Sequence, residues 1–457
     1  MRSTRRQFLQ TSVLASLATG PRALGGPTEI TADQPLDAYQ IASQHSITLS
    51  QPTPDFFEGI LLGNGDVGVC VVVRPDALGL HIGKNDCWDI RVSEEVEEHV
   101  LPFPELLKLW KRASEEAKRR GEPKMTYLEG EIDFFREYAR KTETSYLRPW
   151  PRPWPCGTVW LHWDSRWVEP GEHSLNPANG LFTLKLHCSD FVGNSKTVQL
   201  SCFVDWSTGL ISVVSDADAP ILSIAYSVRI DEGIVLPDGE GSKKRWGALP
   251  HPELHGSAGD HSAEFSHFQY FPAVGPTEHM PSPPKSDKDR NFSLYAKVLG
   301  GWSANLANAG KSISLDSKGE QRICLHIKTA TPRDILLERL KQETSTGDQQ
   351  PWILIPQNHT YSDEDLNTQS YARKEVERLS ALGFNQLRRE SEGQWRAHWA
   401  HSAVQFKDKQ LEKIWYHNQY FLACCLREHK VAPGLFGNWS SGNIGTDWHG
   451  DYHMDYN

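Results

Sequence analysis

The pattern of apolar and polar positions divides the chain into a β-rich part followed by a helical part. From about residue 37 to 91, short apolar runs are broken by Gly, Asn and Asp. The apolar runs on either side of the turn 63–66 predict a hairpin, because Asn-Gly between apolar runs tolerates positive φ at both turn positions. A further strand at 78–82 is followed by residues 83–89, which are dense in polar groups for a strand end.

Strand patterns recur through the middle of the chain at intervals of about 8 to 12 residues, which is typical of an all-β sandwich. They predict strands at 158–163, 181–188, 197–204, 210–214, 221–228, 292–298, 312–315 and 322–327. A helical period over 102–120 and near 131–140 indicates an insertion of two helices that covers the sheet. Residues 236–288 are rich in Pro, Gly, Ser and His, and we expect a loop there.

After residue 329 the pattern becomes helical. Thr331 is a candidate N-cap followed by proline, and Ser362 with Asp365 resembles a capping box that opens a helix towards residue 382. A third helix is expected at 385–402. A fourth, at 408–427, is apolar on every side in its second half, which predicts burial among other helices. The order is therefore a β region, a helical linker and the start of an all-helical domain.

Composition narrows the classes of function. A chain of 457 residues predicts two to three domains. The net charge of -10 argues against nucleic acid or an anionic membrane as a partner. Eight cysteines lack CxxC spacing, so no zinc site is indicated and most are expected to be buried free thiols. A metal site at the histidines 251, 255, 261 and 267 is disfavoured because ligands need rigid geometry. No cofactor is expected.

Residues 1–26 are predicted to be a targeting segment. Arg5 and Arg6 precede a mildly apolar run at 13–18, which matches the twin-arginine export pattern of bacteria. The alternative is a disordered basic tail. No run approaches the roughly 18 apolar residues that a membrane-spanning helix needs. We therefore expect an exported, soluble protein, periplasmic or secreted.

The stretch 432–457 reads APGLFGNWSSGNIGTDWHGDYHMDYN and concentrates glycine, tryptophan, aspartate and histidine. Glycine supplies backbone freedom, and aromatic rings present apolar faces beside fixed polar groups, which suits a sugar. The candidate substrate-binding residues are Trp439, Asp447, Trp448, Asp451 and His453. For the two tryptophans, packing in the core is the alternative.

The last residues alternate in a way that indicates hydrolytic chemistry. In an extended segment His453, Asp455 and Asn457 would lie on one side. A carboxylate and an amide two residues apart could both bind one water, as the base side of an inverting hydrolase requires. Asp455 and Asn457 are therefore the candidate catalytic residues. The alternative is a polar loop whose Asp and Asn side chains bond their own backbone.

Three segments resemble the six-hairpin glycosidases, in particular glycoside hydrolase family 95. Residues 58–68 (EGILLGNGDVG) look like that family's "PIGNGRLGA", and residues 84–88 (KNDCW) are similar to its "LNEDTLW". Residues 435–439 (LFGNW), with 448–457, resemble its "LQGIWN…W…NIN". The known activities of the family are on terminal α-linked fucose and galactose of the L series.

The resemblance implies a multidomain β plus α fold. It consists of an N-terminal β super-sandwich (37–330, with the helical insertion near 103–140), a helical linker (331–402) and the beginning of an (α/α)6 barrel (403–457). In the family, two asparagines hold the nucleophilic water beside the base. By position they correspond to Asp455 and Asn457, and the aspartate is a departure from the family's pattern. The implied function is an inverting glycoside hydrolase acting on terminal sugars of oligo- or polysaccharides.

The general acid of the family is a glutamate deeper in the barrel. Twelve barrel helices need roughly 200 residues, and about fifty remain after residue 402. We therefore expect the N-terminal portion of a longer glycosidase, with a truncated barrel and no activity by itself. The competing interpretation is an exported, non-catalytic carbohydrate-binding protein in which the β-sandwich binds the sugar. A purely structural surface protein is disfavoured because nothing in the chain repeats.

Overall fold

The computed structural model describes residues 36–91, 102–121, 152–216, 221–231, 235–237, 243–245, 248–259, 262–274, 284–307, 312–344, 355, 359–434 and 437–439. The chain falls into two units, Met1–Asp37 and Ala38–Asn457. The predicted signal segment and the second inserted helix near 131–140 lie outside the described residues. The elements described below all belong to the second unit.

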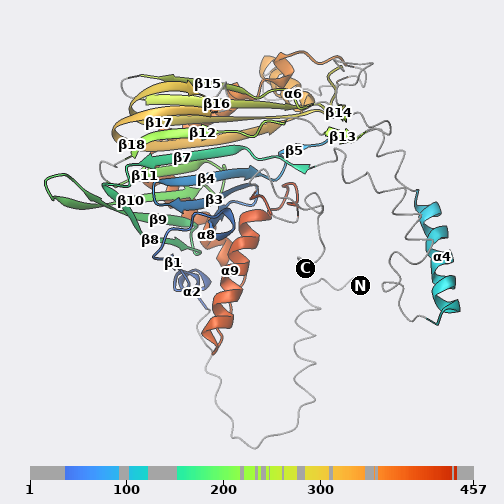
Figure 1. Ribbon diagram of the computed structural model, residues 1–457, viewed down its shortest axis with the longest axis horizontal. Coiled ribbons are helices and arrows are strands. Elements are labelled where there is room, and N and C mark those ends of the chain that lie inside the picture. Colours follow the sequence, from blue (N-terminus) through green and yellow to red (C-terminus); the bar gives the residue numbers. More distant parts are fainter. Residues whose placement is uncertain are drawn as a thin grey trace, which may run out of the picture. The chain divides into compact units, whose positions relative to one another are not determined.

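An antiparallel sheet of fourteen described strands dominates this unit (Figure 1). The main order of strands is β1 (Ile47–Leu49), β8 (Val168–Asn176), β9 (Leu181–Ser189), β10 (Ser195–Val204), β11 (Ile211–Ser215), β18 (Ser312–Ala330), β12 (Ile221–Ser227), β7 (Gly157–Trp163), β4 (Ala77–Lys84), β3 (Val67–Arg74) and β2 (Ile60–Gly63). A branch continues from β18 through β17 (Arg290–Ala307) and β16 (Ser262–Phe271) to β15 (Glu253–Ala258). β5 (Trp88–Asp89) with β6 (Arg152–Pro153), and β13 (Val235–Pro237) with β14 (Lys243–Arg245), form two-stranded sheets.

The predicted hairpin at 63–66 is confirmed. β2 and β3 pair antiparallel with Gly63 opposite Gly68, and Gly65 has a φ of 87°, which glycine adopts without strain. Every residue from 67 to 73 is buried. A strand buried on both faces needs a layer on each side, and both β10 and α9 (Lys409–Cys425) contact β2 and β3. The sheet therefore folds over one shared core at this point.

The helices after residue 331 follow the predicted order. They are α6 (Pro332–Thr344), the 3-10 turn η5 (Glu364–Leu366), α7 (Gln369–Ser380), α8 (Phe384–Trp399) and α9. Earlier in the chain lie α2 (Ala38–Ser43), the 3-10 turn η1 (Phe56–Glu58) and α4 (Phe103–Arg119), the first predicted inserted helix. α7 packs across β16, β17 and β18. No described helix is long and apolar enough to cross a membrane.

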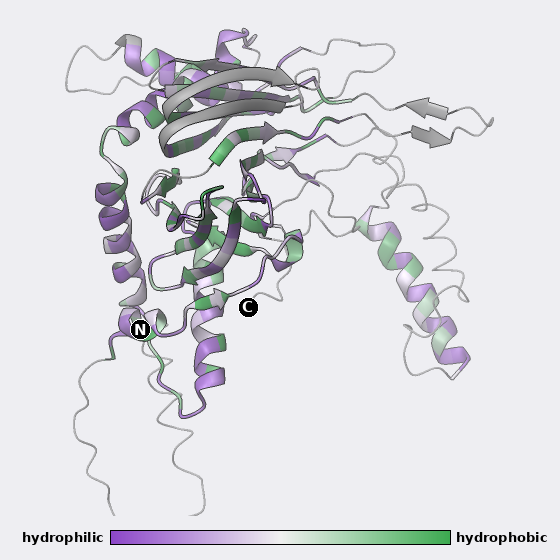
Figure 2. Ribbon diagram, turned by 60° about the vertical axis from the view of Figure 1, so that its left-hand side comes forward, coloured by the Kyte–Doolittle hydropathy of each residue, from purple (hydrophilic) through white to green (hydrophobic). Residues whose placement is uncertain are grey.

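Two helix predictions need correction. The Ser362 backbone N–H and hydroxyl both donate to Asp365 Oδ2, at 2.7 and 2.9 Å, but these bonds lie at the start of η5, and the long helix begins only at Gln369. The apolar half of α9 is not surrounded by helices alone. One side packs on β2 and β3, and on another Tyr420 stacks on Trp395 of α8 at 5.3 Å. Figure 2 shows this helix becoming more hydrophobic towards its C-terminal end.

The predicted loop at 236–288 was wrong for much of its length, because β13 to β16 lie there. On β16, alternate residues face the core, but two of them are the polar His267 and Gln269. Tyr226 Oη lies 2.7 Å from His267 Nδ1, and Gln269 Nε2 donates to the Pro250 carbonyl at 2.8 Å. Buried polar groups that are hydrogen-bonded can occupy core positions, and here they conceal the alternation that would identify the strand.

The structure is a mixed β plus α fold, as the coarse prediction stated. The domain boundaries at 331 and 403, the β super-sandwich and the (α/α)6 barrel stay predictions. All eight cysteines are free and buried, as expected for most of them.

Candidate functional site

The three segments that carry the family resemblance, the third as far as residues 437–439 are described, meet at one end of β2, β3 and β4. Asn85 donates through Nδ2 to the carbonyls of Gly65 and Cys425, at 3.0 Å each. The Gly65 N–H donates to the carbonyl of Cys424 at 2.8 Å. Segments 63–68 and 84–88 thus form a single surface that receives the end of α9. We call this cluster, with residues 424–434 and 437–439, the joint.

The chain after α9 returns to the same surface. Asn438 Nδ2 donates to the Cys424 carbonyl at 2.9 Å, and the Trp439 indole N–H donates to the Leu62 carbonyl at 2.9 Å. The contact is so close that a Cβ atom on Gly68 would lie 2.3 Å from Asn438 Oδ1. Gly68 is therefore needed for close approach. The joint holds the chain at residue 439, directly before the predicted catalytic stretch.

Ion pairs hold the joint together. Lys84 Nζ lies 3.1 Å from Asp66 Oδ1 and 2.6 Å from Asp86 Oδ1, and Lys430 reaches Asp66 Oδ2 at 2.9 Å. Thr329 donates to Asp86 Oδ2 at 2.6 Å. Burial alone would lower the pKa of Lys84, but the two carboxylates hold it above its ordinary value. Burial would raise the pKa of Asp86, but Lys84 outweighs it and the pKa is lowered.

Paired charges of this kind suit positioning rather than proton transfer. A general acid or base works best when its pKa lies near the operating pH, and the pairing moves the pKa values of Lys84 and Asp86 away from that range. The described part of the joint therefore fixes the start of the predicted site. Sequence reasoning noticed the polar density of 84–88, but nothing in the sequence showed that Lys84 bridges Asp66 and Asp86.

Among the predicted site residues, only Trp439 is described. Its side chain is 9% exposed and belongs to the main hydrophobic cluster, with the indole N–H bonded to Leu62. This is the core-packing alternative, so the assignment of Trp439 as a sugar-binding surface needs correction. The others, which lie outside the described residues and stay predictions, are Asp447, Trp448, Asp451, His453, Asp455 and Asn457.

The histidines considered for a metal site do not gather in space as far as they are described. Leu254 pairs with His267 and His255 pairs with Ser266, so the side chains of His255 and His267 point to opposite faces of the β15–β16 pair. Among the described residues, no group of three or more His, Cys, Asp or Glu side chains could hold a metal ion. His261 lies outside the described residues.

Comparisons with known proteins give little further identification. No family model matches the chain, and no curated protein matches it. A solved structure described as "Putative kojibiose phosphorylase from human microbiome" is similar at 11% identity and a TM-score of 0.39. The match covers 83% of this chain and 41% of that protein, so this chain spans less than half of its length. At this TM-score the likeness supports no conclusion about activity.

Proposed function

We propose that the protein is a glycoside hydrolase that acts on terminal sugars of oligo- or polysaccharides, with α-L-fucosidase- or α-L-galactosidase-like specificity. One observation supports this proposal most strongly. The described residues of the third segment that resembles family 95, 437–439, contact the first segment far away in the chain, with Trp439 bonded to Leu62 across 377 positions, while the second segment begins at the end of the strand next to the first.

In the proposed mechanism, Asp455 and Asn457 hold one water against the anomeric carbon. Asp447, Trp448, Asp451 and His453 contact the sugar. The acid that protonates the leaving oxygen approaches from the opposite face, and an inverting reaction needs about 6.5–9.5 Å between the two carboxyl groups to leave room for the water. The joint contributes by fixing the chain at residue 439, which limits where the following residues can lie.

The test is hydrolysis of a panel of aryl glycosides, including α-L-fucosides and α-L-galactosides. The chain 1–457 and the product of the complete open reading frame that encodes it are assayed side by side. We expect the complete product to release the aryl group and Asp455→Ala, which removes one of the two groups that hold the water, to lower kcat by about 10²–10⁴-fold. The matched control, Asp287→Ala, changes an exposed carboxylate on a turn and should leave kcat unchanged. Sugar binding without turnover of any glycoside would instead identify a carbohydrate-binding protein.

Export through the twin-arginine pathway is part of the same proposal. Lysine keeps the positive charge of Arg5 and Arg6 but lacks the planar guanidinium. The double variant Arg5→Lys, Arg6→Lys therefore tests whether export needs the guanidinium groups or only their charge. We expect the unchanged protein in the periplasm or medium and the double variant in the cytoplasm, measured by fractionation and immunoblotting. Equal export of both proteins would contradict this localisation.

A further inference from the structure

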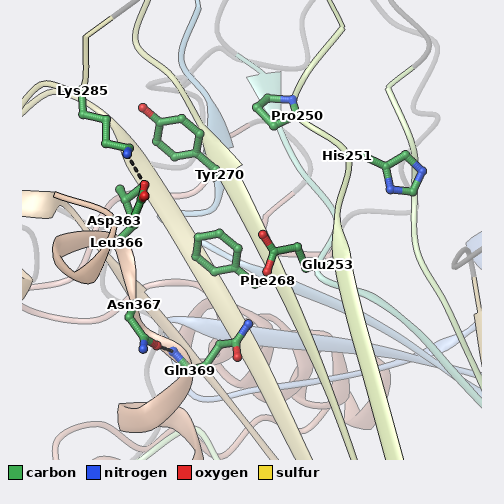
Figure 3. A pocket seen from close by; sticks show the side chains of 10 residues that line it. All are labelled: Pro250, His251, Glu253, Phe268, Tyr270, Lys285, Asp363, Leu366, Asn367 and Gln369. Atoms are coloured by element: carbon green, nitrogen blue, oxygen red, sulfur yellow. Dashed lines mark hydrogen bonds and ion pairs between the residues drawn. The ribbon is translucent and has the colours of Figure 1, made fainter. Parts of the chain in front are cut away.

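A pocket with a volume of about 440 Å³ lies on the outer face of β15 and β16 and shares no lining residue with the joint (Figure 3). Its lining residues are Pro250, His251, Glu253, Phe268, Tyr270, Lys285, Asp363, Leu366, Asn367 and Gln369. The strands form one wall, and η5 with the start of α7 forms the other. Its volume lies within the range of about 300–1,000 Å³ that is usual for small-molecule sites.

Two aromatic rings form the strand wall. Phe268 and Tyr270 are two positions apart on β16, so both point outward, opposite to the core-facing His267 and Gln269. Both rings are half-buried. Glu253 is the direct cross-strand partner of Phe268, and Figure 3 shows its carboxylate beside the Phe268 ring. The pocket therefore places an apolar ring face next to a hydrogen-bond acceptor.

A buried carboxylate fixes this wall. Asp289 is 2% exposed and accepts hydrogen bonds from Tyr270 Oη at 2.5 Å, from the Ala273 N–H at 2.8 Å and from the Ser286 N–H at 2.9 Å. The Ser286 hydroxyl adds a fourth at 3.1 Å. Burial and Asp289 both raise the pKa of Tyr270, so its hydroxyl stays a donor. The Tyr270 ring and the neighbouring Lys285 are thus held in place before any ligand binds.

The opposite wall is also attached to the sheet. The hydroxyl oxygens of Thr368 and Ser293 lie 2.6 Å apart, which joins the start of α7 to β17. Lys285 forms an ion pair with Asp363 across the pocket (Figure 3). Asn367 Oδ1 accepts from the Gln369 N–H at 3.1 Å. These contacts leave the Gln369 carboxamide and the Asn367 Nδ2 group for other partners.

Several polar groups of the pocket lack partners. Within the described part of the chain, no hydrogen bond involves the Glu253 carboxylate or the Gln369 carboxamide. Both side chains line the pocket together with Phe268 (Figure 3). The cation of the pocket, Lys285, is already paired with Asp363. A carboxylate and an amide without partners beside an aromatic ring suit a neutral ligand rich in hydroxyl groups, and they disfavour an anion.

We propose that this pocket binds one neutral saccharide unit, with the C–H face of its ring on Phe268 and its hydroxyls bonded to Glu253 and Gln369. Tyr270 and Leu366 line the apolar remainder of the pocket. The site does not include residues 432–457, so it neither needs nor implies catalysis. It holds a carbohydrate on the β-rich part of the chain.

The test is binding of the full chain to an array of neutral oligosaccharides that end in hexose, deoxyhexose or pentose units. The best glycan is then titrated by calorimetry. We expect Phe268→Ala and Glu253→Gln each to raise the Kd about tenfold or more, because each removes one side of the recognition. Tm and near-UV circular dichroism report whether each variant is folded, and an unfolded Phe268→Ala is replaced by Phe268→Leu, which keeps apolar bulk without the flat ring.

The matched controls change a phenylalanine and a glutamate that lie outside the pocket. Phe191→Ala removes an 85% exposed ring between β9 and β10, and Glu172→Gln removes a half-exposed carboxylate on β8. Neither should change the Kd. Asp455→Ala should also leave it unchanged, which separates this site from the proposed catalytic residues. No binding to any glycan, binding unaffected by both pocket variants, or competition by inorganic phosphate would each overturn the proposal.

Discussion

The joint and the saccharide pocket are both built from charged side chains, amides and aromatic rings, but they differ in how these groups are bonded. In the joint, Lys84 is 8% exposed and paired with two carboxylates, and Asn85 spans two carbonyls. In the pocket, Glu253 and Gln369 face a cavity without a described hydrogen-bond partner. The Lys84 ammonium and the Asn85 Nδ2 group are bonded within the fold and stabilise it, whereas polar groups that face a cavity without a partner remain available to a ligand.

This difference predicts that mutations in the joint reduce stability and that mutations in the pocket reduce binding. The joint connects segments that are hundreds of residues apart, so its loss affects the folded unit as a whole. The pocket sits on a formed wall, because Asp289 and Thr368 hold its sides independently of any ligand. Each prediction below measures one side of this contrast.

The largest expected effect is that of Lys84→Met. It leaves the buried Asp66 and the partly exposed Asp86 without the cation that they share, and removal of one partner from a buried ion pair costs about 3–5 kcal/mol. Urea unfolding followed by tryptophan fluorescence measures the change. Lys185→Met is the control, because the Lys185–Glu172 pair is about half exposed and should contribute under about 1 kcal/mol. Equal losses in the two variants would show that the joint is not a stabilising cluster.

Gly68→Ala should cost about 1–3 kcal/mol, because its Cβ would lie 2.3 Å from Asn438 Oδ1 and force the 424–439 segment to move. Gly393→Ala is the control. It lies within α8, where an added Cβ meets nothing within 4 Å, so alanine should stabilise the helix by about 0.5–1 kcal/mol. In unfolding experiments the two variants should change the free energy of unfolding in opposite directions. Unchanged stability of Gly68→Ala would contradict the close packing.

Acid should weaken the region around the joint. Burial lowers the pKa of His326 to about 4, with a smaller contribution from Lys84. The unfolded state binds this proton more readily than the folded state does. The contribution of His326 to the free energy of unfolding is therefore fully present above pH 6.5, and it falls by about 1–3 kcal/mol as the pH drops towards 4. His326→Gln keeps a donor for the Thr208 carbonyl and should flatten this part of the profile. An unchanged slope between pH 6.5 and 4 would assign the acid sensitivity to other groups.

The smallest expected effect on stability is that of Glu253→Gln. This exposed side chain makes no described hydrogen bond, so the free energy of unfolding should change by under about 0.5 kcal/mol. The same variant should weaken glycan binding. A large loss of stability with unchanged binding would reverse the assignment of this region from ligand site to structural contact.

Sequence reasoning recovered the parts of the fold that local patterns specify. The hairpin at Asn64 and Gly65, the inserted helix α4 and the helices α8 and α9 were expected close to where they lie. β15 and β16 were missed because His267 and Gln269 occupy core positions, where they form hydrogen bonds with partners elsewhere in the chain. A local pattern cannot reveal a partner that tertiary structure supplies.

The same limit applies to the sites. The resemblance selected segments 63–68 and 84–88, but their contact with residues 424–439 is a property of the folded chain. Trp439 was a candidate sugar-binding residue with core packing as the alternative, and its burial distinguishes the two. The saccharide pocket could not be predicted from the sequence. One of its walls consists of strands in a region that was predicted to be a loop, and the other comes from the segment before α7.

The most direct measurement is proton NMR of an aryl α-L-fucoside or α-L-galactoside during hydrolysis by the product of the complete open reading frame. The proposal predicts that the free sugar first appears as the β anomer, because a water held by Asp455 and Asn457 attacks the face opposite the leaving group. First appearance of the α anomer, or no release of sugar, would contradict it.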